Sequence, residues 1–265
     1  MTKIAISGKG GVGKTTLAAL LAHIYVKRGR EVIAIDADPD SNLASALGFS
    51  REAVAKIVPI SEMQELIQER TGAKPGGYGA MFKLNPRVDD IPENYSLKER
   101  GIRLLVMGTV DKGGSGCVCP ENVMLKTLVT HLLLRREEVL IMDMEAGIEH
   151  LGRATAGAVD AFIVVVEPGQ RSLQTARTVA RLASDIGVQY VYVVANKVRN
   201  ESDRAFIIQN LSDMEILGFL PASSRAIEAD LAGAAVFDHD PTLVAEAERI
   251  VDRLEGLIRV RQTTP

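Results

Sequence analysis

Short apolar runs alternate with segments of helical periodicity along most of the chain. Near the N-terminus, Ile4–Ser7 is an apolar run, and Lys14–Lys27 repeats its leucines and isoleucine at helical spacing. Gly29 ends this helix, and Glu31–Ile35 returns to a strand pattern. A strand, a helix and a strand in this order form a βαβ unit, which predicts a parallel sheet with right-handed crossovers.

The rest of the chain repeats this alternation. We predict further strands at Ile102–Met107, Val139–Met142, Ala161–Val166, Tyr190–Ala195 and Glu215–Leu220. We predict helices at Glu121–Arg135, Gln170–Ile186, Glu201–Leu211 and, near the end of the chain, Pro241–Arg261. Runs so rich in Val and Ile suit strands that are buried on both faces. We therefore expect one α/β domain over residues 1–265, with a mostly parallel central sheet and helices on both faces.

Residues 71–94 interrupt the alternation. This segment contains Lys74-Pro75-Gly76-Gly77, Asn85-Pro86 and Ile91-Pro92, which are turn-forming combinations. We expect an irregular excursion or a small hairpin, because the composition of the segment does not justify a separate domain.

Composition excludes several classes of protein. The chain has 265 residues, of which 46% are hydrophobic and 25% charged, as in ordinary globular proteins. The formal charge of -3 gives no basic excess, and 4% aromatics without tryptophan argue against a stacking surface for single-stranded nucleic acid. No apolar run is long enough to cross a bilayer, and the N-terminus lacks a signal pattern. We expect a cytoplasmic protein with neither a nucleic-acid nor a membrane partner.

A glycine-rich motif links the first predicted strand to the first helix. Its residues are Gly8, Lys9, Gly10, Gly11, Val12, Gly13, Lys14 and Thr15, followed by Thr16, and they fit G-x-x-x-x-G-K-[ST]. In such a loop, backbone N–H groups and the helix N-terminus bind phosphate oxygens. Lys14 is expected to reach the β- and γ-phosphates, and Thr15 to bind Mg²⁺. The strand and helix on either side favour a P-loop NTPase over a simple glycine-rich turn.

Acidic residues follow two of the predicted strands. Asp36-Ala37-Asp38-Pro39-Asp40 follows the second strand, and Asp143 ends the run Val139–Met142. The carboxyl ends of parallel strands share the edge of the sheet where ligands bind, so Asp143 is expected to hold Mg²⁺. The alternative for the first segment is loop and helix-capping chemistry, which Asp-Pro-Asp-Ser-Asn also suits.

The choice of base depends on the residues after the strand Tyr190–Ala195. Asn196 and Lys197 begin the guanine-reading pattern N-K-x-D, but Arg199 stands where that pattern needs aspartate. An arginine only donates hydrogen bonds and cannot accept those of guanine. ATP is therefore favoured over GTP as the nucleotide.

Cys117 and Cys119 are the only two cysteines, and they lie in a glycine-rich segment before the helix Glu121–Arg135. A soft divalent metal ion usually takes four thiolates in a closed site. One chain supplies two, so a symmetric dimer would complete the site. A redox pair, two inert thiols and an iron–sulfur cluster stay open as alternatives.

With Lys9 in place, GKGGVGKTT resembles the deviant Walker A family, which includes nitrogenase iron protein and the ParA and MinD ATPases. The resemblance implies a nucleotide-dependent homodimer in which Lys9 reaches the partner's nucleotide; a solvated loop lysine is the alternative. It also implies that Asp38 positions the attacking water, that Asp36 lies near Mg²⁺, and that Gly147 senses the γ-phosphate through its N–H. By the same resemblance, the catalytic residues are Lys9, Lys14 and Asp38, Asp40 belongs to a switch, and Asn196, Lys197 and Pro221 contact the nucleotide.

The segments GGSGCVCPEN, DMEAGIEHLGR, FKLNPRVDDIPE and RLLVMGTV closely resemble the CooC-type accessory ATPases that mature nickel enzymes, notably carbon monoxide dehydrogenase. The resemblance implies an ATPase that delivers Ni²⁺, with Mg²⁺ at the nucleotide and the metal held by Cys117 and Cys119 at a homodimer interface. Zn²⁺ is able to take the place of nickel. Glu145, Glu149 and His150 then belong to the switch segment, although a lone helical histidine is more often a surface or capping residue.

Three other functions are weighed against this one. A close relative in the same family serves acetyl-CoA synthase, and the motifs do not separate the two clients. A ParA/MinD-like positioning ATPase needs a basic face or a terminal membrane helix, and Leu254–Arg261 is short and broken by Gly256. An iron–sulfur ATPase like nitrogenase iron protein needs a cysteine just beyond the Asp143 strand, and Met144–Ile148 has none.

Overall fold

The computed structural model describes residues 2–38, 41–74, 81–108, 119–147 and 151–263. An eight-stranded sheet forms the centre, in the order β3-β4-β2-β5-β1-β6-β7-β8. The strands are β1 (Lys3–Gly8), β2 (Val32–Ala37), β3 (Leu97–Glu99), β4 (Ile102–Val106), β5 (Val139–Met144), β6 (Ala161–Val166), β7 (Val191–Val198) and β8 (Glu215–Pro221). All neighbours pair in parallel except β3 and β4. The expected mostly parallel α/β fold is confirmed.

Each apolar run predicted as a strand forms one, with ends that differ by a few residues. β5 and β7 extend further than predicted, to Met144 and Val198. The antiparallel edge strand β3 was not predicted, because three partly exposed residues carry too short a pattern to recognise.

The five predicted helices are present as α1 (Lys14–Lys27), α6 (Pro120–Arg135), α8 (Gln170–Asp185), α9 (Glu201–Asn210) and α12 (Pro241–Thr263). The other helices, which were not predicted, are α2 (Leu43–Ala46), α3 (Arg51–Val54), α4 (Gln64–Thr71), α5 (Ile91–Asn94), α7 (Arg153–Ala156), α10 (Ser224–Ala232) and α11 (Val236–His239), with a 3₁₀ turn at Ile60–Glu62. Most of them are single turns, which leave no periodic signal in a sequence.

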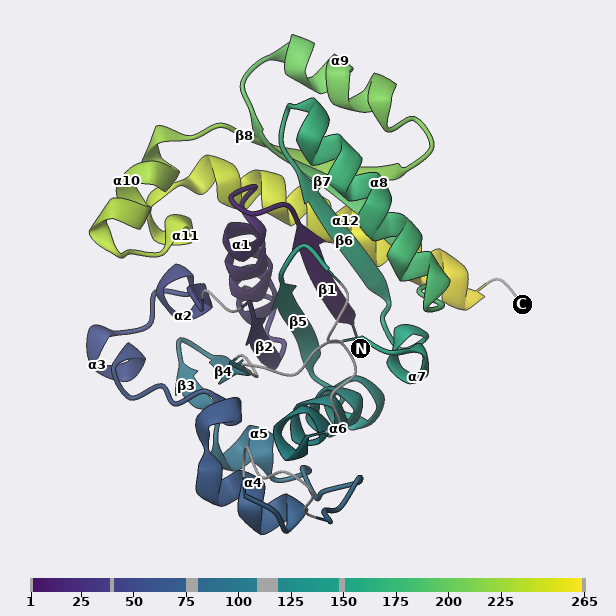
Figure 1. The fold of residues 1–265 in the computed structure, drawn as a ribbon. Coiled ribbons are helices and arrows are strands. Elements are labelled where there is room, and N and C mark those ends of the chain that lie inside the picture. The colour runs from purple at the N-terminus through teal and green to yellow at the C-terminus, as the bar shows by residue number, and fades with distance from the viewer. Residues whose placement is uncertain (1, 39–40, 75–80, 109–118, 148–150, 264–265) are drawn as a thin grey trace.

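Two hydrophobic cores lie on opposite faces of the sheet. Ile4 and Ile6 of β1 pack with α1 and α12, whereas Ala5 packs into the core formed with α6 and α8. This alternation follows from the period of two along a strand. The helical layers on the two faces are visible in Figure 1. With both faces covered, the strand ends are where the sheet presents polar groups.

The excursion at residues 71–94 shares the core of the domain. Val88 and Ile91 of the excursion are buried with the α6 side of the sheet, as is Ile67 of α4, the helix that leads into it. Figure 1 shows α4 and α5 gathered beside α6. The described part of the excursion contains no strand, and residues 75–80 lie outside the described residues.

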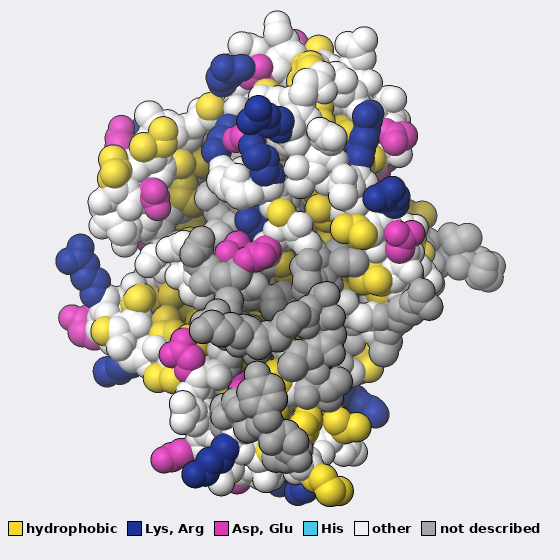
Figure 2. All heavy atoms as spheres, viewed as in Figure 1, with side chains coloured by type: hydrophobic (Ala, Val, Ile, Leu, Met, Phe, Trp, Pro, Cys, Tyr) yellow, Lys and Arg dark blue, Asp and Glu magenta, His cyan; other side chains and the backbone are white. Residues whose placement is uncertain are grey.

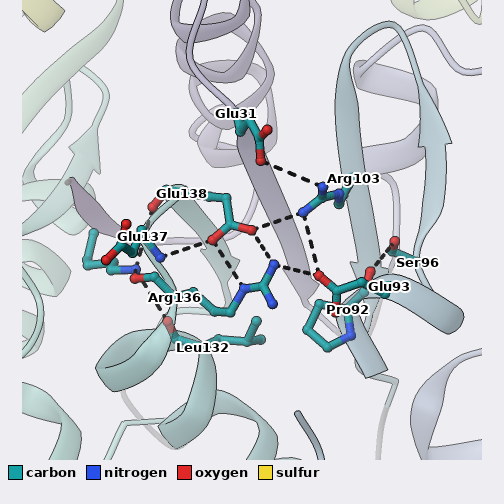
Figure 3. A network of polar contacts seen from close by, with 10 residues as sticks. Glu31, Pro92, Glu93, Ser96, Arg103, Leu132, Arg136, Glu137 and Glu138 are labelled. Carbon is teal, nitrogen blue, oxygen red and sulfur yellow. Dashed lines mark hydrogen bonds and ion pairs between the residues drawn. The ribbon is translucent and has the colours of Figure 1, made fainter. Parts of the chain in front are cut away.

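An ion-pair network joins several elements at the amino end of the sheet, opposite the ends of the strands that carry the acidic residues. Glu138, just before β5, accepts from Arg103 of β4 at 2.9 Å and also pairs with Arg136. Arg136 continues the network to Glu93 of α5 at 2.7 Å, and Arg103 lies 3.6 Å from Glu31 (Figure 3). These pairs connect α5 and the end of α6 to the sheet at a distance from the nucleotide motif.

Within the part of the chain that the structure describes, no helix is long and apolar enough to cross a membrane. On the face shown in Figure 2, lysine and arginine side chains are interspersed with acidic ones.

Candidate functional site

The phosphate loop connects the central strand β1 to helix α1. Gly8 ends β1, and a Cβ placed there would stand 2.5 Å from the carbonyl oxygen of Val165 in β6. Gly13 caps α1 in the left-handed region with φ 95°, and a Cβ there would stand 2.1 Å from the side-chain nitrogen of Asn196. Both positions require glycine, so the loop lies tightly against β6 and β7 while α1 begins beneath it.

Three strand ends converge on one pocket. It is lined by Gly10, Gly11, Gly13, Lys14 and Thr15 of the loop, by Asp38 and Asn42 after β2, and by Glu145 and Ala146 after β5. The sequence predicted that these segments meet at the carboxyl edge of the sheet, and the structure places them there. Thr16, Asn196, Lys197 and Pro221 are not among the described residues that line the pocket.

Two side-chain pairs form here: Lys14 with Asp38, and Thr15 with the buried Asp143, which does not itself line the pocket. The Lys14 ammonium, which is almost fully buried, lies 3.4 Å from the Asp38 carboxylate. The Thr15 hydroxyl donates to Asp143 Oδ2 at 2.6 Å. The other oxygen, Asp143 Oδ1, is buried, and no donor among the described residues reaches it. A hydroxyl beside a carboxylate with an unsatisfied oxygen is a donor set that fits Mg²⁺.

Asp36 lies beside Asp143, its partner in the register of β2 and β5. Its Oδ1 accepts from the N–H of Asp38 at 3.3 Å and its Oδ2 from the N–H of Leu43 at 3.0 Å. Asp36 therefore holds the backbone of the loop that carries Asp38. The expectation that it also lies near Mg²⁺ stays a prediction.

Burial changes the acidity of both carboxyls. Burial raises the pKa of Asp143 to about 7, while the hydrogen bond from Thr15 opposes this and the charge of Asp36 adds to it. Burial also raises the pKa of Asp36 to about 6, against the backbone N–H groups that it accepts. A divalent cation at this place would favour the ionised forms, so proton release accompanies its binding.

Asn196 and Lys197 contact the phosphate loop. The Asn196 amide donates to the carbonyl of Val12 at 2.8 Å, and its oxygen accepts from the N–H of Lys197 at 2.8 Å. Lys197 has a left-handed backbone with φ 57°, and its ammonium donates to the carbonyl of Gly11 and pairs with Glu167 at 3.2 Å. The contact of both residues with nucleotide stays a prediction. Sequence reasoning missed Glu167, because a single acid after a strand carries no motif.

Arg199 and Pro221 lie at the carboxyl ends of β7 and β8. Arg199 makes a bidentate pair with Asp203 of α9, at 2.7 and 2.8 Å. Its guanidinium is therefore engaged by α9 and not by the phosphate loop. Pro221 ends β8 opposite Val198.

The remaining predicted residues are described only in part. Lys9 is half-buried in the loop, and Gly147 is buried after β5. Cys119 is half-buried and stands at the N-cap position of α6. Asp40 and Cys117 lie outside the described residues, as do Glu149 and His150. Within the described ranges, no three His, Cys, Asp or Glu side chains come together as a metal site would require.

Residues 3–236 match the family described as the CobQ/CobB/MinD/ParA nucleotide binding domain. MinD of Aquifex aeolicus has a similar structure, with a TM-score of 0.67 at 21% identity over 96% of this chain and 97% of that one. Fold, phosphate loop and family together define a P-loop ATPase.

Two curated relatives are more similar in sequence. One is the carbon monoxide dehydrogenase accessory protein CooC of Rhodospirillum rubrum, 47% identical, with 95% of each chain covered. The other is an uncharacterised ATP-binding protein of Methanocaldococcus jannaschii, 46% identical over 99% of this chain and 100% of that one. The chain therefore belongs to the CobQ/CobB/MinD/ParA family and, within it, to the CooC-type accessory ATPases.

Proposed function

We propose that this protein is an ATP-driven nickel metallochaperone that matures carbon monoxide dehydrogenase. The observation that carries the proposal is the joint presence of the phosphate pocket and of a Cys-x-Cys segment ending at Cys119, the N-cap of α6, in a chain 47% identical to a carbon monoxide dehydrogenase accessory protein. Because α6 leads directly into β5 and then into Glu145 and Ala146 at the pocket, nucleotide and cysteines are connected through one helix and one strand.

The nucleotide half of the function follows from the contacts in the pocket. The Lys14 ammonium pairs with the Asp38 carboxylate, and an incoming triphosphate would bind this ammonium in place of Asp38. Asp38 would then be available to orient the attacking water, while Thr15 and Asp143 hold Mg²⁺ on the phosphates. Lys9 completes the site of the partner protomer, and Gly147 reads the presence of the γ-phosphate.

Nickel is the cargo of this cycle. Cys117 and Cys119 of two protomers supply four thiolates, which suit a soft divalent ion better than the oxygen ligands of the pocket. Metal and ATP both favour the dimer, so each strengthens the binding of the other. Hydrolysis relaxes the segments after β2 and β5, moves the cysteine segments apart and releases the metal to the apo-enzyme.

The shared metal site is tested by sedimentation during titration with Ni²⁺ or Zn²⁺. We expect one metal ion per two chains, with the mass doubling as metal binds. The double variant Cys117→Ser/Cys119→Ser should lose both effects, whereas Lys14→Ala, which keeps the thiolates, should still bind metal. Metal binding at unchanged stoichiometry by the double variant, or one ion per monomer without change in mass, would show that the site is not shared.

The client is tested by reconstitution. Apo-forms of carbon monoxide dehydrogenase and of acetyl-CoA synthase are incubated with the nickel-loaded protein and ATP. Activation of the former in an ATP-dependent manner supports the proposal, and activation of the latter alone assigns the chain to the alternative client.

A further inference from the structure

A buried hydroxyl connects the strand that leads into the phosphate loop to the segment that follows Asp143. Ser7 precedes Gly8 in β1, and its side chain is fully buried. The Ser7 hydroxyl donates to the carbonyl of Glu145 at 2.6 Å and lies 3.2 Å from the carbonyl of Gly147. One proton cannot serve two acceptors fully, so the shorter bond to Glu145 dominates.

The position of Ser7 in the sheet does not require a hydroxyl. Its backbone is already paired with Val164 of β6. Ala5, two residues earlier and therefore on the same face, packs in the core with α6 and α8. An apolar side chain would continue that core, yet Ser7 instead bonds to backbone carbonyls 138 and 140 residues away.

The segment that Ser7 contacts forms one wall of the phosphate pocket. Glu145 and Ala146 line the pocket together with Lys14 and Thr15, and Gly147, the next residue, is buried. Since Ser7 adjoins Gly8, the same strand end holds the phosphate loop and the segment 145–147. Ser7 thereby adds to the pairing of β1 with β5 and to the bond from Thr15 to Asp143 in setting their relative position.

We infer that Ser7 is a positioning residue for ATP hydrolysis, whose hydroxyl holds the backbone of residues 145–147 where it meets the γ-phosphate. This inference rests on the proposed role of Gly147. Ser7 is not among the described residues that line the pocket, so the loss of its hydroxyl should slow the chemical step and leave the binding of ADP intact. A buried neutral hydrogen bond is worth a factor of about five to ten, so we expect kcat to fall by about that factor.

Ser7→Ala is compared with wild type and with a matched control, Thr71→Val. The Thr71 hydroxyl is also fully buried and also donates to a backbone carbonyl, that of Ile67, at 2.6 Å, but it lies on α4 and not on the pocket. The Thr71 hydroxyl also accepts from the N–H of Ala73 at 3.3 Å, so Thr71→Val should lose at least as much stability in urea as Ser7→Ala. Only Ser7→Ala should lower kcat while the Kd for ADP stays within about twofold. Ser7→Cys, which keeps a weak donor, should fall between wild type and Ser7→Ala.

Hydrogen exchange of the amides of residues 145–147 gives a readout that is independent of activity. We expect faster exchange there in Ser7→Ala and not in Thr71→Val. Wild-type kcat in Ser7→Ala, or equal losses of kcat and ADP affinity in both variants, would overturn the inference. If the wild-type protein hydrolyses no ATP, the proposed function fails, and unchanged exchange at 145–147 would then overturn the inference separately.

Discussion

Two buried carboxyls, Asp36 and Asp143, stand side by side where the phosphate loop meets β2 and β5. Both oxygens of Asp36 accept from backbone N–H groups that follow β2, whereas Asp143 accepts from Thr15 at one oxygen only. Asp36 therefore shapes the loop, whereas Asp143 has one oxygen without a hydrogen-bond partner among the described residues, which we expect to bind Mg²⁺.

The first prediction concerns pH in the absence of Mg²⁺. Burial raises the pKa of Asp143 from 3.8 to about 7 and that of Asp36 from 3.8 to about 6. At pH values between 3.8 and these raised pKa values, the folded state binds more protons than the unfolded state. The contribution of the pair to stability is therefore present at low pH and is lost as pH rises toward about 7, at up to ~1.4 kcal/mol per pH unit for each group. Urea unfolding of wild type and Asp143→Asn over this window should show a flatter pH dependence in the variant; parallel curves would contradict it.

The second prediction separates binding from chemistry. Lys14→Ala should lose at least about tenfold in affinity for ADP, because the ammonium contacts ground-state phosphates. Asp38→Ala should keep ADP binding and lose hydrolysis, because the carboxylate acts on the attacking water. Calorimetric titration and phosphate release measure the two effects. Unchanged turnover in Asp38→Ala would show that Asp38 does not act on the attacking water.

At the scale of elements, the ends of β6 and β7 support the phosphate loop from the side. Glu167 follows β6, Lys197 lies in β7, and their ion pair continues to the carbonyl of Gly11. Asn196 adds a bond to Val12. The loop thus keeps its shape through neighbouring strands as well as through its own glycines.

The third prediction follows from this support. Lys197→Met should weaken the binding of ADP and the binding of inorganic triphosphate by the same factor, about three- to tenfold. The reason is that Lys197 acts through the phosphate loop, which both ligands contact. Glu167→Gln should act in the same direction with a smaller effect, since its pair is partly exposed.

Arg199→Met is the matched control, because this arginine is a near neighbour whose guanidinium pairs with Asp203 of α9. It should leave both affinities unchanged. A loss of affinity confined to ADP in Lys197→Met would show that Lys197 contacts the nucleoside directly, in line with the nucleotide contact that the family resemblance implies.

At the scale of the whole molecule, the carboxyl edge of the sheet carries the phosphate loop, the loop after β2 and the segment after β5, while the ion-pair network occupies the amino edge. Lys9 and Cys119 belong to segments on the carboxyl side. A dimer that shares nucleotide and metal would therefore join two copies through this edge.

The fourth prediction tests that arrangement. Lys9→Ala should stay monomeric with ATP and hydrolyse it at least about tenfold more slowly, while still binding it, because Lys9 acts in the partner's site. Lys27→Ala is the control: this exposed lysine at the other end of α1 pairs with Glu248 of α12. Sedimentation in the presence of ATP measures the oligomeric state, and steady-state turnover measures the rate of hydrolysis. A Lys9→Ala dimer of normal activity would make Lys9 an ordinary loop residue.

The sequence by itself determined the class of fold, the phosphate loop and the family. These depend on local signals: apolar runs of strand length, helical periodicity, and a glycine motif whose flanking elements are contiguous with it. The same signals predicted that Asp38 and Asp143 lie at the carboxyl edge of the sheet, and the structure has them there, whereas their roles stay predictions. The roles of Cys117 and Cys119 remain predictions.

Only the tertiary structure decided which partner each polar side chain finds. Thr15 meets Asp143 across 128 residues and Ser7 meets Glu145 across 138, while Asn196 and Lys197 bond to the loop 184 and 186 residues before them. The strand order, with β1 between β5 and β6, creates these encounters. A hydrogen bond depends on distance and direction between atoms, and neither is encoded by the spacing of residues along the chain when the sheet brings remote segments together.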